Sequence, residues 1–550
     1  MLARLEERAE RPRYLVLDAN GWSPVTWREH AQQIEGVAAF CTSWGLQPGD
    51  RVAIFADNRV EWMAAALGIQ AAGGVAVPIY PGSTADQATY VLGHGQCRLV
   101  LVDDPARLER VLAPGASLPE LSAAVMLDPR ARVPETAELV VRSWAEVMDE
   151  GRAHDGRAPE RLAARLERLD PHQPALMLYT SGTTGRPKGV PLTHANLAIN
   201  WSDWMRSNAP LIEEHAVDLL WLPMSHVFGY GEAHTGNTLG FTSYLCDPGS
   251  VLGLLPELRP SVFLSVPAYW EKLATLAMAH DGPEDRVRAL LEATGGRLRF
   301  CLSGGARLRP EIKALFHQAG IRLLEGYGLT ECSPTLTVER PDAGRIDSVG
   351  QPLPSVELRI ADDGEIQARG PGVFGGYHRD PEATAAAFTP DGWFRTGDLG
   401  RLTEDGSLRL TGRRKEILVT SGGKNVPPVD IETRLCAHPW VLHAMVYGDG
   451  KKFLTAGIWL DHERIEHDLG ARGLPRPQHA EAVRAAVAQA VEQVNAELAR
   501  FEQIKRFCVM ERPLSVEGGH LTTTLKLRRH HIQAAFHDEL EALYAEGTPR

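Results

Sequence analysis

The chain has 550 residues, of which 44% are hydrophobic and 23% charged, and it carries a formal net charge of −12 at pH 7. A chain of this length does not normally fold around a single hydrophobic core, so several domains or subdomains are expected. The composition excludes a disordered or fibrous protein. The acidic balance argues against a nucleic-acid-binding protein, since such proteins carry a basic face.

Cysteine usage and the apolar segments indicate a cytoplasmic protein. Seven scattered cysteines form no Cys-x-x-Cys pair, which is typical of inert, buried thiols in a reducing compartment. The charged N-terminal segment lacks the apolar core of a signal peptide. The longest uncharged stretch, residues 62–85, contains Gly73-Gly74 and Pro78 and predicts a buried helix and a strand rather than a membrane span. Peripheral contact with a membrane remains an alternative.

Helical and strand patterns alternate along most of the chain. The pattern predicts helices at Trp27–Trp44 and Asn58–Ala72 and strands at Arg51–Phe55 and Leu99–Val102. Such alternation is typical of an α/β architecture with crossover helices. The polar residues 149–165 are expected to form a surface connection that includes a helix.

A loop rich in glycine and hydroxyl residues follows the apolar run at residues 175–178. It reads Tyr-Thr-Ser-Gly-Thr-Thr-Gly-Arg-Pro-Lys-Gly from Tyr179 to Gly189, and a helix is expected after it at His194–Trp204. Glycines let backbone N–H groups wrap an oxyanion, hydroxyls donate further bonds, and Lys188 adds positive charge. The loop is a candidate phosphate cradle, although it is not a Walker A loop, because no hydroxyl residue follows the lysine. A flexible surface turn is the alternative.

Three further apolar runs each precede a polar or glycine-rich segment. Strands are expected at residues 219–222, 298–302 and 321–324. His226 follows the first run, Gly304-Gly305-Ala306 the second and Tyr327 the third.

The pattern changes near residues 409–415. Before this point the chain is rich in short strands and Gly/Pro turns. After it, strands are expected at Val441–Tyr447 and Phe453–Leu460 and a long helix at Glu481–Arg500. These elements predict a small α+β unit that folds separately.

Eight ordered segments resemble motifs of the AMP-forming acyl-CoA synthetases of the long-chain fatty acid–CoA ligase type, within the adenylate-forming enzyme superfamily. The resemblance extends over essentially the whole chain. Besides the loop at residues 179–189, the segments are Leu222–Phe228, Ser303–Ala306, Glu325–Glu331, Gly392–Gly400, Gly412–Ile417, Ser421–Pro427 and Leu521–Lys526.

The resemblance implies an α/β enzyme in two parts. A large N-terminal adenylation domain of several subdomains, residues 1–411, would be followed by a small mobile α+β domain, residues 412–550, with the active site between them. The implied reaction uses ATP and Mg²⁺ to convert a carboxylic acid, most simply a long-chain fatty acid, to an acyl-adenylate. CoA then takes the acyl group, and the products are acyl-CoA, AMP and pyrophosphate.

The resemblance also implies roles in the N-terminal part. Glu331 would be the magnesium ligand, with Thr184 helping through water. Tyr327 would stack on adenine, the neighbouring Gly328 would belong to the nucleotide-binding residues, and Thr330 would contact the α-phosphate. A helix N-terminal acid facing the helix dipole is the alternative for Glu331. The residues expected to hold the β- and γ-phosphates are Thr180, Ser181, Gly182, Thr183, Thr184, Gly185 and Lys188.

The acyl side of the site is implied by two segments. The backbone of Gly304, Gly305 and Ala306 would approach adenine and the acyl pocket, where a larger side chain would clash; an ordinary glycine turn is the alternative. His226 would lie beside the carboxylate, although a lone histidine is more often an ordinary hydrogen-bonded residue. Residues 227–230 would line the acyl tunnel. Many fatty acyl-CoA synthetases have Glu-Arg after the phenylalanine, whereas this chain has Gly-Tyr-Gly-Glu232, so the acyl chain length stays open.

In the C-terminal part, the resemblance gives Lys526 the catalytic role of bridging the carboxylate and the α-phosphate. A solvated basic face with Arg528 and Arg529 is the alternative, and Lys505 is the rival cation.

Five further residues are implied for nucleotide and thiol binding. Asp398 would accept both ribose hydroxyls, with an ordinary turn aspartate as the alternative, and Arg413 would contact ribose or phosphate. Lys415 would mark the hinge about which the small domain rotates. Gly422 and Gly423 would line the pantetheine tunnel, with a plain hairpin turn as the alternative.

Other functions with the same motifs remain open. An acyl-AMP ligase would load the phosphopantetheine of a carrier protein, and an aryl or short-chain acid–CoA ligase would differ only in the acid. A catalytically silent scaffold and a luciferase-type oxygenase are more distant alternatives. No Ser-His-Asp set is evident, so no covalent enzyme intermediate is expected.

Overall fold

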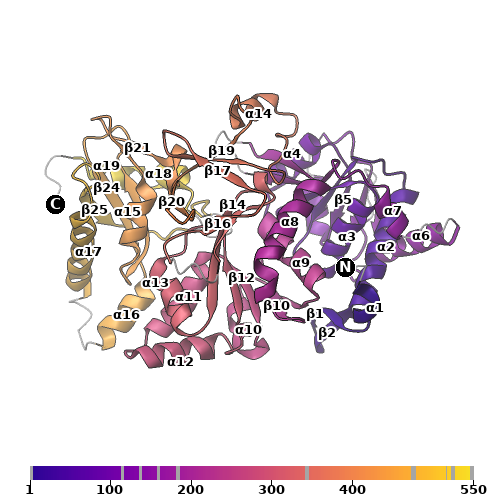
Figure 1. Ribbon diagram of the computed structural model, residues 1–550, viewed down its shortest axis with the longest axis horizontal. Coiled ribbons are helices and arrows are strands. Elements are labelled where there is room, and N and C mark those ends of the chain that lie inside the picture. Colours follow the sequence, from indigo (N-terminus) through magenta and orange to yellow (C-terminus); the bar gives the residue numbers. More distant parts are fainter. Residues whose placement is uncertain are drawn as a thin grey trace. The chain divides into compact units, whose positions relative to one another are not determined.

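The computed structural model (Figure 1) describes residues 4–112, 117–134, 139–157, 162–180, 186–340, 346–471, 479–515, 517–521 and 527–545. The chain folds as two compact units. One consists of Met1–Gly305, Glu311–Leu358 and Ala368–Arg395, and the other of Ala306–Pro310, Arg359–Gln367 and Thr396–Arg550. Helices and parallel strands alternate in the first unit, which confirms the predicted α/β class.

The first unit contains a seven-stranded sheet in the order β7-β6-β5-β3-β4-β8-β9. All neighbours pair in parallel except β8 and β9, which form an antiparallel hairpin. Central strands are buried on both faces, which explains their continuous Val/Ala/Leu runs. The strands are β3 (Arg51–Phe55), β4 (Val75–Ile79), β5 (Cys97–Val102), β6 (Ala123–Met126), β7 (Val140–Ser143), β8 (Pro174–Thr180) and β9 (Lys188–Thr193).

Helices around this sheet agree closely with the sequence patterns. Helix α2 starts where Thr26 and Glu29 form a reciprocal capping box, which fixes its first turn. The predicted surface connection at residues 149–165 instead contains parts of two helices, α6 and α7. The helices are α1 (Leu5–Arg8), α2 (Trp27–Ser43), α3 (Val60–Ala71), α4 (Ala85–Gly95), α5 (Pro105–Val111), α6 (Trp144–Arg157), α7 (Leu162–Glu167) and α8 (His194–Asn208).

Two smaller sheets complete the first unit, in the orders β10-β11-β1-β2 and β12-β13-β14-β15-β16. Their strands are β1 (Pro12–Asp18), β2 (Gly21–Thr26), β10 (Val217–Leu220), β11 (Thr242–Leu245), β12 (Val262–Ser265), β13 (Phe300–Ser303), β14 (Arg322–Gly328), β15 (Thr335–Val338) and β16 (Gln351–Pro352). The accompanying helices are α9 (Val227–Leu239), α10 (Val251–Leu258), α11 (Pro267–Met278), α12 (Pro283–Ala293), α13 (Pro310–Gln318) and α14 (Pro381–Ala387).

The structure corrects two predicted strand boundaries. The strand expected at residues 219–222 ends at Leu220. Trp221 and Leu222 are buried, but they make side-chain bonds in place of further ladder pairs: the Trp221 indole N–H donates to the Leu264 carbonyl of β12, and the Leu222 carbonyl accepts from the Asn58 side chain. The strand expected at residues 321–324 continues to Gly328, because its second half pairs with β15.

A buried ion triad holds α13 against β14. The ammonium group of Lys313 lies 2.7 Å from a carboxylate oxygen of Glu339 and 3.1 Å from one of Glu325. All three side chains are almost completely buried, and the Glu325 amide also donates to Glu339 at 2.7 Å. Burial raises the pKa of Glu339 to about 7, although Lys313 opposes the rise. Glu325 is two residues before Tyr327, so the triad fixes the strand that carries the predicted adenine residue.

The second unit contains most of a four-stranded sheet β17-β18-β19-β20, a hairpin β21-β22 and a three-stranded sheet β23-β24-β25. The strands are β17 (Glu357–Ile360), β18 (Glu365–Arg369), β19 (Phe394–Leu402), β20 (Leu408–Arg413), β21 (Leu418–Val419), β22 (Asn425–Val426), β23 (Val441–Tyr447), β24 (Leu454–Leu460) and β25 (Ile504–Val509). The helices are α15 (Pro428–Leu435), α16 (His462–Ala471), α17 (His479–Ala496), α18 (Arg529–Ala535) and α19 (His537–Ala542).

The C-terminal strand predictions are confirmed, but the long helix predicted at Glu481–Arg500 is shorter at its C-terminal end. Helix α17 ends at Ala496 because Asn495 bonds to the start of β25 instead of continuing into a further turn. Its side chain accepts from the Ile504 amide and donates to the Ile504 carbonyl, both at 2.8 Å. This local side-chain bond competes with the helical ladder.

Two sequence expectations concern the whole chain. All seven cysteines are thiols outside any disulfide; four are buried as predicted, whereas Cys246, Cys436 and Cys508 are half-buried. Burial raises the pKa of Cys41 and Cys97 to about 12, so these thiols stay protonated and unreactive. Among the described residues, none of the helices has the length and apolar content that a membrane span requires.

Candidate active site

The predicted phosphate loop connects β8 to β9 in the first unit. Thr180 ends β8 directly opposite Lys188, the first residue of β9. Ser181, Gly182, Thr183, Thr184 and Gly185 lie outside the described residues. The Lys188 ammonium lies 4.7 Å from the centre of the Tyr377 ring, a cation–π contact.

Aromatic and histidine side chains hold both ends of this loop. The Tyr90 hydroxyl donates to the Pro187 carbonyl at 3.0 Å, and the Tyr179 hydroxyl lies 2.9 Å from Nδ1 of His94. The His378 ring contacts His94 edge-on, and burial lowers the pKa of both histidines, which therefore favours their neutral form. These contacts therefore fix the residues on both sides of the loop.

The predicted adenine and metal residues lie at the end of β14. Tyr327 is buried and pairs with Thr337 across the hairpin. A Cβ atom on Gly328 would lie 1.8 Å from the carbonyl oxygen of Pro334. The close approach of this backbone segment therefore requires glycine at position 328, whether or not a nucleotide binds there. Thr330 and Glu331 follow in a 3₁₀ turn (Thr330–Cys332).

Glu331 is held by the segment that contains Tyr377. The Tyr377 hydroxyl donates to Oε1 of Glu331 at 3.0 Å, and the Phe374 amide donates to the Glu331 carbonyl at 2.8 Å. The alternative reading, an acid at a helix N-terminus, is weak because the 3₁₀ turn has only three residues. Its side-chain bond to Tyr377 fixes the carboxylate instead.

These residues fit a magnesium ion that is held mainly by phosphate. Within the described parts of the chain, no group of three or more His, Cys, Asp or Glu side chains could hold a metal by itself. Mg²⁺ keeps several waters and typically takes one or two carboxylates together with substrate phosphates. A single oriented carboxylate near a phosphate-binding lysine is consistent with this requirement.

Gly304 and His226 come together through Phe228. Strands β13 and β14 are parallel, so Gly304 and Tyr327 both lie at the carboxyl edge of that sheet, where α/β proteins bind ligands. A Cβ atom on Gly304 would lie 3.1 Å from the Phe228 ring. His226 caps the N-terminus of α9, and its Nδ1 accepts from the Phe228 amide at 3.2 Å. The structure therefore agrees with the alternative interpretation of His226 as an ordinary hydrogen-bonded residue, and its place beside the carboxylate stays a prediction.

Gly305 and Ala306 are both exposed. Gly305 is the last residue of a segment of the first unit, and Ala306 begins a short segment of the second unit. Gly305 has φ of +86° in the first unit, a conformation that favours glycine. This confirms that Gly305 occupies a turn, the alternative interpretation, while its contact with nucleotide stays a prediction.

In the second unit, Asp398 and Arg413 form an ion pair. They lie directly opposite each other on β19 and β20, and Nε of Arg413 is 3.0 Å from a carboxylate oxygen of Asp398. The Thr396 hydroxyl accepts from the Asp398 amide at 3.1 Å and donates to the Ile366 carbonyl, which fixes the turn before Asp398. The structure therefore brings together the two residues predicted to contact ribose.

We expect Asp398→Asn to raise the KM for ATP by about 10–100-fold, because bonds to a charged acceptor contribute roughly 1.5–3 kcal/mol. Steady-state kinetics with varied ATP would measure this. The matched control is Asp363→Asn, which removes an exposed carboxylate that pairs with Arg414 at 2.8 Å, one residue after Arg413. An unchanged KM in Asp398→Asn would contradict the ribose assignment.

The predicted hinge and thiol-tunnel residues lie on the next elements. Lys415 is exposed in a 3₁₀ turn (Arg414–Glu416) between β20 and β21. Gly422 and Gly423 form the exposed tip of the β21-β22 hairpin, and Gly423 has φ of +73°. The hairpin-turn interpretation of these glycines is confirmed; their roles in rotation and thiol binding stay predictions.

Lys526 lies outside the described residues, whereas the structure describes the neighbouring cations Arg528 and Arg529. Arg529 is partly buried and pairs with both carboxylate oxygens of Glu432 at 2.7 and 2.8 Å, so the alternative of a solvated basic face does not describe Arg529, whereas Arg528 is exposed. Lys505 is exposed and donates to Gln503 at 2.7 Å.

Sequence reasoning missed Tyr377 and Thr396. Tyr377 follows Gly375-Gly376 outside the recognised segments, whereas Thr396 lies within the recognised segment Gly392–Gly400 but was given no role. The Tyr377 hydroxyl bonds to the Glu331 carboxylate and the Thr396 hydroxyl to the Asp398 backbone amide, and these contacts could be recognised only in three dimensions.

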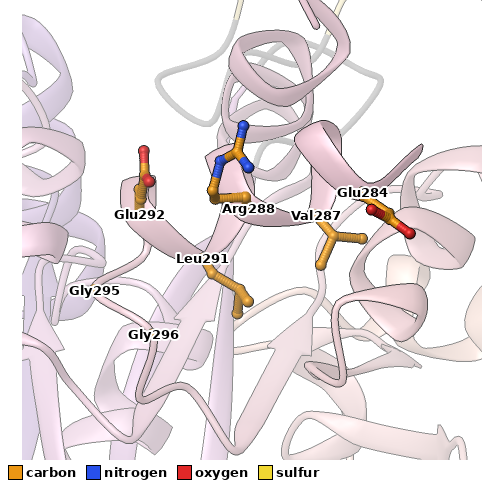
Figure 2. Close-up of a pocket in the computed structure, with 7 residues that line it drawn as sticks. All are labelled: Glu284, Val287, Arg288, Leu291, Glu292, Gly295 and Gly296. Carbon is orange, nitrogen blue, oxygen red and sulfur yellow. The ribbon is translucent and has the colours of Figure 1, made fainter. Parts of the chain in front are cut away.

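A surface pocket of about 450 Å³ is unrelated to these residues (Figure 2). It is lined by one face of α12 and the glycine turn that follows it, and it contains none of the predicted site residues. Its lining residues are Glu284, Val287, Arg288, Leu291, Glu292, Gly295 and Gly296.

Comparison with curated proteins finds relatives of nearly equal length. The long-chain-fatty-acid–CoA ligase FadD15 of Mycobacterium tuberculosis is 34% identical over 98% of this chain and 96% of its own. The mouse long-chain-fatty-acid–CoA ligase ACSBG1 is 29% identical over 96% of this chain and 82% of its own.

Solved structures share the fold. ATP-bound MatB from Rhodopseudomonas palustris superposes with a TM-score of 0.74 at 26% identity, covering 98% of this chain and 99% of MatB. The adenylation domain of a carboxylic acid reductase from Segniliparus rugosus, with AMP and a carboxylic acid bound, superposes with a TM-score of 0.80. At 22% identity over 100% of this chain and 94% of that one, the latter shows the fold alone.

Family models match both parts of the chain. The AMP-binding enzyme model matches residues 5–378, and the AMP-binding enzyme C-terminal domain model matches residues 415–548. The first covers more than half of the chain, and the 34% identity to FadD15 covers nearly all of it. The chain therefore belongs to the AMP-binding enzyme family.

Proposed function

We propose that the protein activates a long-chain fatty acid with ATP and transfers the acyl group to CoA, giving acyl-CoA, AMP and pyrophosphate. The observation that carries this proposal is the bonded arrangement of Lys188, Tyr377 and Glu331 at the base of the glycine-rich loop. The names of the relatives FadD15 and ACSBG1, both long-chain-fatty-acid–CoA ligases, support the choice of a long-chain acid and of CoA.

The first half-reaction requires two anions to meet, the carboxylate and the α-phosphate. Catalysis is therefore mainly charge neutralisation and positioning. In this proposal Lys188 and the loop bind the β- and γ-phosphates, Thr330 contacts the α-phosphate and Tyr327 stacks on adenine. Glu331, with Thr184, would hold Mg²⁺, which would screen the phosphate charge when bound.

Residues of the second unit take part in both half-reactions in this proposal. Asp398 and Arg413 bind ribose, and Lys526 stabilises negative charge while the acyl-adenylate forms. Rotation at Lys415 then brings Gly422 and Gly423 to the thiol. We place the domain boundary between residues 411 and 412, a few residues before the match to the C-terminal domain model begins.

The acceptor and the location are further parts of the proposal. CoA is preferred to a carrier protein because the curated relatives are CoA ligases. A cytoplasmic location with peripheral membrane contact would suit a lipid substrate.

The test is AMP release measured with CoA across acids from acetate to long-chain and aromatic ones. We expect the highest kcat/KM with long-chain fatty acids, and CoA should serve better than a carrier protein as acceptor. A preference for aromatic or short acids, or strict dependence on a carrier protein, would contradict the proposal.

A further inference from the structure

The Tyr377 side chain contacts two predicted nucleotide-site residues that are far apart in sequence. Its hydroxyl donates to Oε1 of Glu331 at 3.0 Å. The face of its ring carries the Lys188 ammonium at 4.7 Å. One half-buried tyrosine therefore connects the carboxylate assigned to magnesium with the lysine assigned to the β- and γ-phosphates.

The backbone around Tyr377 is fixed independently of these two contacts. On one side, the Phe374 amide donates to the Glu331 carbonyl at 2.8 Å. On the other, the His378 amide donates to the Gly189 carbonyl at 2.8 Å, next to Lys188. The Tyr377 amide donates to the Thr384 hydroxyl at 2.9 Å, which anchors the segment to α14.

A ligand carboxylate binds a metal well only when it is held in one orientation. Groups that hydrogen-bond to a metal ligand orient it and tune its basicity, and their loss typically costs 10–100-fold in metal affinity or activity. A donor fixed to Oε1 restricts rotation of the Glu331 carboxylate. The Lys188 ammonium is held beside the same tyrosine by its attraction to the ring. A bound polyphosphate would attract the ammonium more strongly than the ring does.

We infer that Tyr377 is a positioning residue that orients Glu331 for Mg²⁺ and holds Lys188 ready for the polyphosphate. This inference rests on the proposed function, because that function assigns Glu331 and Lys188 to the nucleotide. Tyr377 itself touches no reacting atom in this account. It sets the magnesium concentration at which ATP binds.

A purely structural role makes a different prediction. The Tyr377 ring packs edge-on against Phe374 at a centroid distance of 4.9 Å. Tyr377→Phe keeps this packing and the ring face under Lys188 and deletes only the hydroxyl. If the tyrosine served packing alone, its phenylalanine variant would bind magnesium and ATP like the natural protein.

The experiment is a calorimetric titration of ATP into the full-length protein at a series of Mg²⁺ concentrations, without fatty acid or CoA. We expect Tyr377→Phe to require roughly 10–100-fold more Mg²⁺ for half-maximal enhancement of ATP affinity. Its affinity for ATP without metal should stay unchanged. With Mn²⁺ in place of Mg²⁺, the electron paramagnetic resonance signal of free Mn²⁺ should show the same loss of metal binding.

The matched control is Tyr269→Phe, which likewise removes a single tyrosine hydroxyl; the hydroxyl of Tyr269 donates to the Pro248 carbonyl at 2.9 Å. Its Mg²⁺ requirement should equal that of the natural protein. An unchanged requirement in Tyr377→Phe would overturn the inference and leave the proposed function standing. Failure of the natural protein to bind ATP in a magnesium-dependent way would overturn the proposed function and, with it, the inference.

Discussion

Lys526→Ala is expected to slow acyl-adenylate formation by about 100–1,000-fold, because loss of one preorganised group that stabilises developing negative charge has an effect of this size. Thioester formation from preformed acyl-adenylate should change little, since AMP is already an excellent leaving group in that step. Single-turnover measurements of each half-reaction would separate the two effects. This division of labour is the sharpest consequence of the role that the family resemblance gives to the lysine.

The control for this variant is Lys505→Ala. Lys505 is the other candidate cation, and it is exposed with its ammonium bonded to Gln503 at 2.7 Å. Both half-reactions should stay near their natural rates in Lys505→Ala. A result in which Lys526→Ala slows both half-reactions equally, or in which Lys505→Ala produces the larger loss, would show that the assignment is wrong.

Lys313→Met is expected to lower the free energy of unfolding by about 3–5 kcal/mol, because it removes one partner of a buried ion cluster and leaves uncompensated acid groups. Glu325 and Glu339 are only 3% and 6% exposed, so neither can regain water in the folded state. Denaturant unfolding monitored by circular dichroism would measure the loss. Tyr327 lies on the same strand as Glu325, so the KM for ATP should rise as well.

The pH dependence of this loss follows from the buried carboxyl groups. The pKa of Glu339 is already raised to about 7 by burial, although Lys313 opposes the rise. A carboxyl whose folded pKa is raised favours folding at low pH and loses that contribution as pH rises toward the folded pKa. Without Lys313 both acids must stay protonated to remain buried, so the stability deficit should be larger at pH 8 than at pH 6.

The matched control is Lys272→Met, on the exposed face of α11. The exposed Lys272 ammonium lies 5.2 Å from the Tyr269 ring, a cation–π contact of small energy. Stability should change by less than about 1 kcal/mol. Equal losses in the two variants, or a deficit in Lys313→Met that does not grow with pH, would contradict the account of the triad.

The elements with strong periodicity could be predicted from sequence, whereas boundaries set by side-chain bonds could not. Arg51–Phe55 and Val441–Tyr447 are strands at the predicted residues, because their apolar runs are buried in sheets. The long C-terminal helix ends early because Asn495 bonds to β25, and no pattern in its own segment indicates that partner. The end of β14 could not be predicted from its own segment either, because its second half pairs with β15.

In the candidate site, too, some residues could be predicted from sequence and others could not. Resemblance identified Asp398 and Arg413, and the structure brings them within 3.0 Å. It could not identify the roles of Tyr377 and Thr396, because their bonds to the Glu331 carboxylate and the Asp398 amide depend on where the neighbouring segments fold rather than on a motif. Gly328 was interpreted as a nucleotide residue, yet the nearby Pro334 carbonyl already requires glycine there. Lys526 and the residues from Ser181 to Gly185 stay predictions from sequence.

The central claim is that this protein forms an acyl-adenylate from ATP and a fatty acid. Exchange of labelled pyrophosphate into ATP, measured with purified protein, Mg²⁺ and a long-chain fatty acid but no CoA, tests it most directly. The account predicts exchange that depends on the acid and disappears when Mg²⁺ is chelated. Absence of exchange with every acid from acetate to long-chain and aromatic ones would contradict it.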